Sequence, residues 1–320
     1  MSIEEAVKQQ LSETVKGTDF EKLGEKYQGK VRDVYQTEDQ LIIVTTDRVS
    51  AFDHVLGTIP FKGQILNAIA AHGFEQTKDI AQNHVVSIPD PNVLIAKKAK
   101  PYAVEFIIRG YITGSLWRDY QSGKADAYGI DFGAGLKKDQ AFASPIMTPS
   151  TKAELGMHDE PISKAAIVER GLMTQEQLDE AEDIALKLYA RGVELAAKQG
   201  LILVDTKYEM GLDADGKLTV IDEIHTPDSS RFWIADQYES RFAAGESQAM
   251  LDKENLRQWL IETHGFSGDG TPPALDDAIR TELACKYADL YQRLTGTEFS
   301  PTLGDPSERM RANLAKANLL

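Results

Sequence analysis

Residues 201–223, LILVDTKYEMGLDADGKLTVIDE, decide the prediction of the fold. Two segments suited to strands, 201–210 and 217–223, flank the turn GLDADG, so the pattern predicts an antiparallel hairpin. Because side chains alternate between the two faces of a strand, one face of the first strand carries three charges: Asp205, Lys207 and Glu209. The other face is mostly apolar, so we expect a strand that leaves the core and enters a cleft.

The charged face of this hairpin suits an ATP–magnesium site. A lysine can contact phosphate oxygens, and carboxylates are ligands that Mg²⁺ prefers. The returning strand ends in two further acids, Asp222 and Glu223. A solvated face with cross-strand salt bridges explains the same residues, and the hairpin alone favours that explanation.

The residues before the hairpin predict a small sheet that carries one helix, in a first domain over residues 1–100. Apolar spacing predicts a surface helix over 2–16 and a second helix over 64–76. Alternating or wholly apolar segments predict the strands of this sheet. They cover residues 30–36, 41–46, 85–88 and 93–97.

Residues 101–320 are expected to form a larger second domain, which makes the protein a member of the α+β class. A strand over 104–109 and a helix over 115–121 open this domain. The stretch 122–163 is rich in glycine, proline and small polar residues and lacks clean periodicity. A loop of this length inside a domain is usually functional.

Two helices of the second domain have clear boundaries. Thr174 and Gln177 suit the capping box of a long helix, and Gly200 suits its end. Near the C-terminus, Asp305 followed by proline is a good start for the last helix.

Composition excludes several classes of function. Fifty acidic and 35 basic side chains give a formal charge of −15, which disfavours binding to nucleic acid or to an anionic membrane. The single cysteine, Cys285, permits no internal disulfide, and no apolar run reaches the length of about 20 residues that spans a bilayer. We expect a cytoplasmic protein whose partners are small molecules. A monomer is expected, with an oligomer left open.

Arg109 lies at the end of the apolar strand 104–109, where an unpaired charge would be costly. A bound anion or a buried carboxylate must therefore neutralise it, and the sequence favours neither. Ser115 follows at the predicted start of a helix, where free backbone N–H groups bind anions.

The loop HTPDSSR, residues 225–231, directly follows the hairpin. Its Asp228, Ser230 and Arg231 combine an acid, a hydroxyl and a guanidinium that can bind a phosphate or carboxylate in a fork. An ordinary turn with a surface arginine is the more common structure for such a string.

Seven segments, in this order, together resemble the SAICAR synthetase (phosphoribosylaminoimidazole-succinocarboxamide synthase) family. They are GKVRDVY, TDRVSAFD, KGQILN, EFIIRGYITGS, TPSTKAELGMHDE, VDTKYEMG and DEIHTPDSSRFW. The resemblance covers residues 24–233 and continues more loosely to about residue 300. RGYITGS and TPDSSRFW are its most specific segments, and residues 300–320 have no counterpart.

The resemblance implies a two-lobed fold, with an N-terminal antiparallel sheet similar to the small lobe of protein kinases and ATP between the lobes. The family's phosphate-covering loop matches Gly29, Lys30, Val31 and Arg32. Its nucleotide and metal contacts match Lys207 and Glu209, and its second metal-side acid falls on Asp222 or Glu223. ATP and Mg²⁺ are thereby implied.

The resemblance also implies the substrates. Positions that hold carboxyaminoimidazole ribotide (CAIR) match Arg109, Ser115, Asp205, Asp228, Ser230 and Arg231. Lys152, His158 and Asp159 lie in the segment that the family places near its substrates, which include L-aspartate. Lys207 and Asp228 are the expected catalytic residues.

The implied reaction is the ATP-dependent ligation of CAIR and aspartate to SAICAR, through an acyl phosphate. Two other interpretations stay open. A small-molecule kinase would leave the phosphoryl group on its product, and a regulatory module would bind nucleotide without turnover.

Overall fold

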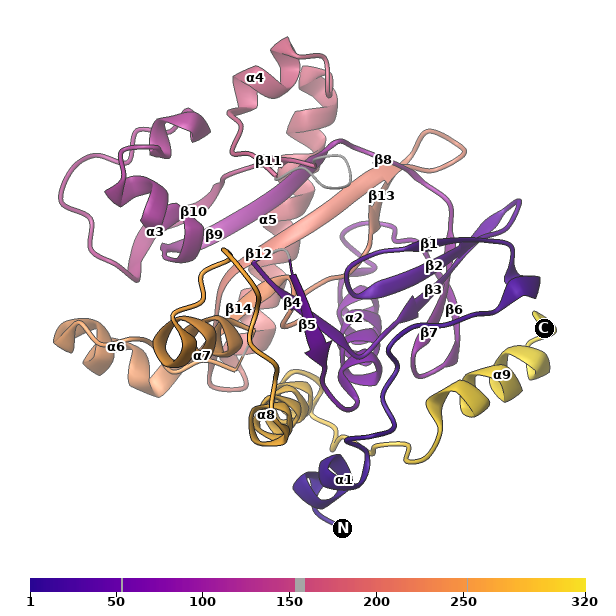
Figure 1. Cartoon of the computed structure of the whole chain (residues 1–320). Coiled ribbons are helices and arrows are strands. Elements are labelled where there is room, and N and C mark those ends of the chain that lie inside the picture. The colour runs from indigo at the N-terminus through magenta and orange to yellow at the C-terminus, as the bar shows by residue number, and fades with distance from the viewer. Residues whose placement is uncertain (53, 153–158, 252) are drawn as a thin grey trace.

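The computed structural model describes residues 1–52, 54–152, 159–251 and 253–320. Its chain forms two antiparallel sheets of five and seven strands, a two-stranded hairpin and several helices around them (Figure 1). The expected α+β class is confirmed. The likeness of the N-terminal sheet to a kinase small lobe stays a prediction.

The N-terminal sheet has the strand order β1-β2-β3-β7-β6. Its strands are β1 Glu25–Gln28, β2 Arg32–Gln36, β3 Gln40–Thr45, β6 Val85–Asp90 and β7 Val93–Lys97. The short strands β4 Arg48–Ala51 and β5 His54–Thr58 form the separate hairpin, and helix α2, Lys62–Thr77, follows it. The predicted strands and helix of this region are all present.

Each face of the N-terminal sheet is covered by a helix. Ile42 and Val44 of β3 share a buried core with Met310 and Leu314 of the last helix, α9 Pro306–Lys316. On the opposite face, Ile43 lies with residues of α2 around a small cavity. Alternation along β3 thus gives each helix an apolar surface to cover.

The second sheet is built on β12, Leu201–Leu212, which pairs with four other strands. Its other strands are β8 Lys100–Pro101, β9 Val104–Ile112, β10 Gln140–Met147, β11 Ser150–Thr151, β13 Leu218–Ile221 and β14 Ser230–Ile234. The predicted hairpin is present, since Glu209 pairs with Ile221 and Leu212 with Leu218. Helix α5, Gln175–Ala197, packs on this sheet and has the predicted capping box at Thr174.

The C-terminal helices return to the N-terminal elements. These helices are α6 Ala235–Ala244, α7 Glu254–His264 and α8 Asp277–Thr295. Helix α8 lies beside α1, Ile3–Gln9, and α2, and their buried side chains form one core with those of α7 (Figure 1). The division into domains at residue 100 stays a prediction, because this core joins residues from both sides of it.

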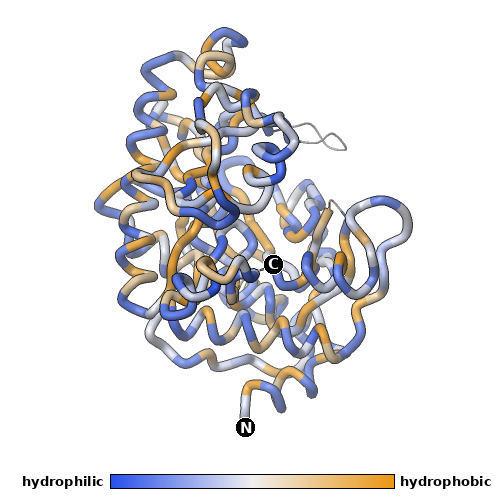
Figure 2. The backbone as a smooth tube through the Cα atoms, turned by 90° about the vertical axis from the view of Figure 1, so that its left-hand side faces the viewer, coloured by the Kyte–Doolittle hydropathy of each residue, from blue (hydrophilic) through white to orange (hydrophobic). Residues whose placement is uncertain are grey.

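Along the helical parts of the chain, hydrophobic and hydrophilic segments alternate (Figure 2), which is the pattern of helices that bury one face. In the described ranges, no helix has both the length and the apolar composition that a membrane span requires.

Two expectations about local structure are wrong. The first helix ends at Gln9, not near residue 16, because Val15 instead takes part in the core under the N-terminal sheet. The stretch 122–163 is not a single long loop. Its described residues contain the 3-10 turn Ala125–Tyr128 and the strands β10 and β11, and helix α4, Lys164–Glu169, follows it. Strand β10 is largely exposed and has an irregular register with β9, so its sequence shows no alternation.

Candidate active site

A cavity of about 190 Å³ lies where β9, β12 and β14 meet the start of α7. Its lining brings together predicted residues from distant parts of the chain. They are Arg109, Ser115, Asp205, Lys207, Asp228, Ser230 and Arg231. Lys253, Glu254 and Arg257 of the C-terminal segment line it as well, and the sequence analysis did not include them.

Arg109 and Arg231 share one buried carboxylate. Asp205 of β12 lies directly opposite Arg109 of β9 on one side and Arg231 of β14 on the other. Nη1 of Arg109 lies 3.0 Å and Nη1 of Arg231 lies 2.7 Å from the same oxygen, Oδ2 of Asp205. A carboxylate does neutralise Arg109, as one of the two expectations held, and Arg231 also pairs with Glu254 over 3.4 Å. The cavity lining as a whole carries more basic than acidic side chains, which leaves an excess of positive charge: the bases are Arg109, Lys207, Arg231, Lys253 and Arg257, and the acids are Asp205, Asp228 and Glu254. Such an excess favours a bound anion.

Ser115 completes this anion-binding corner. Nη2 of Arg109 lies 3.2 Å from Oγ of Ser115, in the first turn of α3, Gly114–Gln121. Burial lowers the pKa of Arg109, while Asp205 opposes the shift. Gly114 has φ +58, and a Cβ atom there would lie 2.4 Å from Nη2 of Arg231. Only glycine therefore lets α3 start so close to Arg231.

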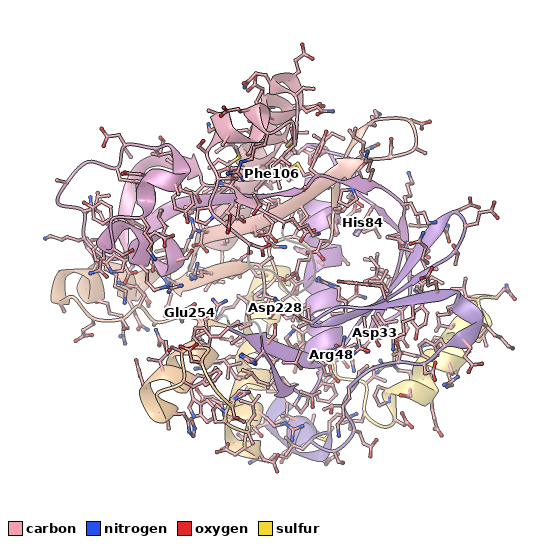
Figure 3. The ribbon with its side chains drawn as sticks, turned by 45° about the horizontal axis from the view of Figure 1, so that its top comes forward. Asp33, Arg48, His84, Phe106, Asp228 and Glu254 are labelled. Carbon is pink, nitrogen blue, oxygen red and sulfur yellow. The ribbon has the colours of Figure 1, made fainter. Side chains whose placement is uncertain are left out.

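The second part of the cavity contains Asp228. Nζ of Lys62, at the start of α2, donates to Oδ2 of Asp228 over 2.7 Å, and Nζ of Lys253 lies 3.9 Å from the same oxygen. Ser230 is buried, and its hydroxyl oxygen lies 2.8 Å from that of Thr206 in a hydrogen bond. Figure 3 shows Asp228 near the centre of the molecule, between the N-terminal strands and the second sheet.

Lys207 lies inside a cluster of carboxylates next to this cavity. Its Nζ lies 2.5 Å from Glu209, 3.3 Å from Glu105 of β9 and 3.4 Å from Asp222. Burial lowers the pKa of Lys207, but these carboxylates raise it well above the ordinary value. Lys207 is therefore a permanent cation that faces the cavity.

Arg32 joins the N-terminal sheet to this cluster. Its guanidinium lies 2.5 Å from Asp222 and 2.8 Å from Glu223, just beyond the end of β13. Burial raises the pKa of Asp222, but Arg32 and Lys207 lower it far more, so Asp222 is ionised. Asp222 faces Lys207, whereas Glu223 accepts a hydrogen bond from Thr226 over 2.5 Å.

Arg48 fixes the loop Gly29–Val31, between β1 and β2, by hydrogen bonds to its backbone. This buried arginine donates to the carbonyl oxygens of Gly29 and Lys30, each over 3.0 Å, and lies 2.8 Å from Asp33 (Figure 3). Thr46 donates to the carbonyl of Val31 over 2.7 Å. The loop backbone is thus fixed, and Lys30 is left at its exposed surface.

Residues 152 and 159, on either side of the segment that the structure does not describe, also act on the carboxylates. Lys152 forms an ion pair with Glu209. Burial raises the pKa of Glu105, Lys207 opposes this shift, and Glu209 and the exposed Asp159 add to it. The predicted residue His158 lies outside the described residues.

Four residues of the site were not predicted from the sequence, because the local sequence around them contains no recognisable binding motif. They are Lys62, Glu105, Lys253 and Arg257. Lys62 does lie in the segment KGQILN, so that segment was the one available signal for it.

Within the described part of the chain, no group of three or more histidine, cysteine, aspartate or glutamate side chains is arranged to hold a metal ion. Glu209 and Asp222 nevertheless place carboxylate oxygens around one cationic centre, the ammonium of Lys207. Since Mg²⁺ is often held by one or two carboxylates together with substrate phosphates, this pair fits that ion.

An anion-binding corner with excess positive charge, beside a lysine held among acids, defines an enzyme that acts on anionic small molecules. The family model of SAICAR synthetase matches residues 25–271. The chain belongs to the SAICAR synthetase family, the carbon–nitrogen ligases that join CAIR and aspartate in purine biosynthesis.

Relatives named phosphoribosylaminoimidazole-succinocarboxamide synthase match most of the chain. The protein of Legionella pneumophila (strain Paris) is 49% identical over 280 residues, which cover 86% of this chain and 89% of the relative. That of Cytophaga hutchinsonii is 47% identical and covers 95% of this chain and 99% of its own length. The Arabidopsis thaliana relative, named as chloroplastic, is 45% identical, with 99% of this chain and 78% of the relative covered.

Solved structures agree with the fold. The SAICAR synthase of Saccharomyces cerevisiae complexed with SAICAR has a TM-score of 0.77 and 32% identity and covers 90% of this chain and 100% of its own. A type-2 SAICAR synthetase in complex with ADP has a TM-score of 0.67 and 25% identity over 87% of this chain and 100% of its own.

Proposed function

We propose that this chain performs the family reaction by transferring the γ-phosphoryl group of ATP to the carboxylate of CAIR. The observation that carries this mechanism is that one cavity contains both the Arg109–Asp205–Arg231 corner and Lys207. A single ligand in the cavity can therefore have one anionic end at the arginines and a second anionic end at the lysine.

The arginines are proposed to bind the 5′-phosphate of CAIR. Arg109, Arg231 and Ser115 line this cavity and can provide charge-assisted hydrogen bonds to a phosphate. Lys253 and Arg257 add positive charge at the same cavity, from the C-terminal segment. CAIR would then extend with its carboxylate toward Lys207.

The first chemical step is attack by a carboxylate oxygen of CAIR on the γ-phosphorus of ATP, which breaks the bond to the bridging oxygen and releases ADP. Lys207 is proposed to stabilise the charge that develops on the phosphoryl oxygens. The loop Gly29–Arg32, fixed by Arg48, is proposed to cover the phosphates of ATP. The complex of a relative with ADP supports nucleotide binding in this fold.

In the second step the amine of L-aspartate attacks the carbonyl carbon, phosphate leaves, and the nitrogen loses a proton. Lys152 and Asp159, together with His158, are proposed to lie near the aspartate, and Asp228 and Ser230 near the ribotide. No covalent enzyme intermediate is required, so most of the acceleration comes from holding three anionic reactants together.

Glu209 and Asp222 are proposed to hold Mg²⁺, which would neutralise charge on the ATP phosphates. The geometry favours Asp222 over Glu223 for this role, because Asp222 faces Lys207 and Glu223 is occupied by Thr226. A cytoplasmic location and a monomeric state also remain proposals.

The test is release of ADP with Mg–ATP, CAIR and L-aspartate, each omitted in turn. Release that needs all three, with SAICAR as product, is expected. Full release without aspartate would instead indicate a small-molecule kinase, and no release in any mixture would indicate a nucleotide-binding module.

A further inference from the structure

Lys62 reaches the substrate cavity from the N-terminal half of the chain, from a backbone that is held in place. The preceding residue, Phe61, has φ 62, which is uncommon for a residue with a side chain and often occurs at functional sites. Asp47 accepts a hydrogen bond from the backbone N–H of Gly63 over 2.9 Å. A Cβ atom on Gly63 would lie 2.2 Å from the carbonyl oxygen of Thr45, so the first turn of α2 packs closely against the end of β3.

The side chain of Lys62 is fully buried and ends in a single contact. Its exposed fraction is 0%, and Nζ has Asp228 as its one hydrogen-bond acceptor among the described residues. A buried ion pair is costly to desolvate, and replacing both of its partners by apolar side chains is often neutral for stability, whereas removing one partner leaves the other charge buried and unpaired. The pair as a whole is therefore weak evidence for a purely structural role.

The carboxylate of Asp228 has a free acceptor. One oxygen, Oδ2, receives Lys62, while the other, Oδ1, is buried without a hydrogen-bond partner in the described structure. Such an atom needs a hydrogen-bond donor from a water or a ligand. Asp228 lines the cavity that the ribotide is proposed to occupy, so a donor group of the ribotide can satisfy Oδ1 when it binds.

The donors of the ribotide are few. Its phosphate and carboxylate are ionised at neutral pH and accept hydrogen bonds only, whereas its ribose hydroxyls and its amino group donate. The ribose is the part of CAIR that joins the phosphate to the imidazole, and Asp228 lines the same cavity as the arginines and Lys207. A ribose hydroxyl is thus the donor that suits Oδ1.

We propose that Lys62 is a positioning residue, which orients Asp228 so that its Oδ1 accepts a hydrogen bond from a ribose hydroxyl of CAIR. This inference rests on the proposed function, since it takes CAIR as the ligand. Lys62 does not touch the substrate and acts through Asp228. It also links the N-terminal half of the chain to the ribotide loop.

The test compares Lys62→Met with the wild-type protein in the ADP-release assay. Loss of a hydrogen bond to a charged group corresponds to about 10- to 100-fold in affinity, so the KM for CAIR should rise by that factor. The KM values for ATP and aspartate should change by less than about twofold, because those substrates do not contact Asp228. A rise in the aspartate KM instead would assign Oδ1 to the aspartate ammonium and overturn the proposal.

Arg309→Met is the matched control. Arg309 forms an ion pair with buried Asp90, 3.1 Å apart, and is not among the residues that line the cavity. Its loss should lower the melting temperature and leave the KM for CAIR unchanged. If Lys62→Met only lowers the melting temperature in the same way, its role is structural and the proposal is wrong.

The pH profile gives a second readout. Burial raises the pKa of Asp228, but Lys253 and Lys62 lower it to about 2, with a smaller contribution from Arg32. Removing Lys62 should raise that pKa, so kcat/KM for CAIR should fall at a higher pH on the acid side than in the wild type. An unchanged acid limb would contradict the proposal.

If Lys62→Met does not fold, the double variant Lys62→Met/Asp228→Asn removes both charges and can be compared with Asp228→Asn alone. The dissociation constant of CAIR, measured by calorimetry, should be the same in both, because Lys62 acts through Asp228. A further loss of affinity in the double variant would overturn the inference. Failure of the wild type to turn over CAIR would reject the proposed function itself, whereas a normal Lys62→Met in an active enzyme would reject this inference alone.

Discussion

At the scale of single residues, the site depends on charges that neighbouring strands place side by side. Arg109, Asp205 and Arg231 lie on three adjacent strands and occupy directly opposed positions, so the backbone register creates the anion-binding corner. Lys207, two residues beyond Asp205, faces the carboxylates of Glu209 and Glu105. The alternation of a single strand thus supplies groups for both ends of the proposed ligand.

Arg231→Ala should raise the KM for CAIR more than the KM for ATP. The variant removes one of two guanidinium groups at the proposed phosphate site, a loss of about 1.5–3 kcal/mol for a hydrogen bond to a charged group. Steady-state kinetics with each substrate varied in turn measures both constants. Equal changes in the two would remove Arg231 from the ribotide site.

Lys207→Ala should abolish turnover and leave the protein folded. The lysine is the cation proposed to face the γ-phosphate, and removing such a group commonly lowers kcat by a factor of about 10² to 10³. The comparison is kcat together with a circular dichroism spectrum. Near-normal kcat in a folded Lys207→Ala protein would show that the assigned catalytic role is wrong.

At the scale of elements, α9 covers a face of the N-terminal sheet that would otherwise be exposed. Met310 and Leu314 are completely buried against that sheet. Arg309 and Asn313 both contact Asp90 at the turn between β6 and β7, over 3.1 and 2.7 Å. Helix α9 therefore belongs to the core of the N-terminal part. The expectation that residues 300–320 have no counterpart is wrong, because the match to the Arabidopsis thaliana relative covers 99% of this chain.

Leu314→Ala should destabilise the protein by about 2–5 kcal/mol, the usual cost of truncating a buried leucine. Thermal or urea unfolding measures the change, and Lys316→Ala, at an exposed position on the same helix, is the control. Equal stability of the two variants would show that α9 does not contribute to the core.

At the scale of the whole molecule, an acidic protein concentrates basic groups at one site. The formal charge is −15, yet one cavity is lined by Arg109, Lys207, Arg231, Lys253 and Arg257. Glu254 pairs with Arg231 and Arg257, and Asp228 with Lys253, and these cations lower the pKa values of both acids. The stability of the molecule at low pH therefore depends on the site.

Glu254→Gln should make acid unfolding less steep. Burial raises the pKa of Glu254, but Arg231 and Arg257 lower it to about 2, below its ordinary value of 4.5. The carboxylate thus contributes stability that is complete above about pH 4.5 and is lost as the pH falls toward 2, by up to about 3 kcal/mol. Urea unfolding of both proteins between pH 6 and pH 3 measures the slope, and identical slopes would contradict the shift.

Local patterns were sufficient for the elements that bury one face. The hairpin β12–β13, the helix α5 with its cap at Thr174 and the start of α9 at Asp305 all follow from spacing and capping residues. Strand β10 could not be predicted from such patterns, because an exposed edge strand with irregular register needs no apolar alternation. The resemblance to the family predicted which residues belong to the site, but it did not predict the contacts between them.

The α+β class, the hairpin and the candidate charges of Asp205, Lys207 and Glu209 could be predicted from local sequence, because alternation and turn chemistry act over a few residues. Which of these charges contact one another depends on the tertiary structure. Lys62 contacts Asp228 across 166 positions, and Arg32 contacts Asp222 across 190. Contacts of that kind are set by how two sheets and the C-terminal helices pack together, and no local pattern encodes the distance between residues so far apart in the chain.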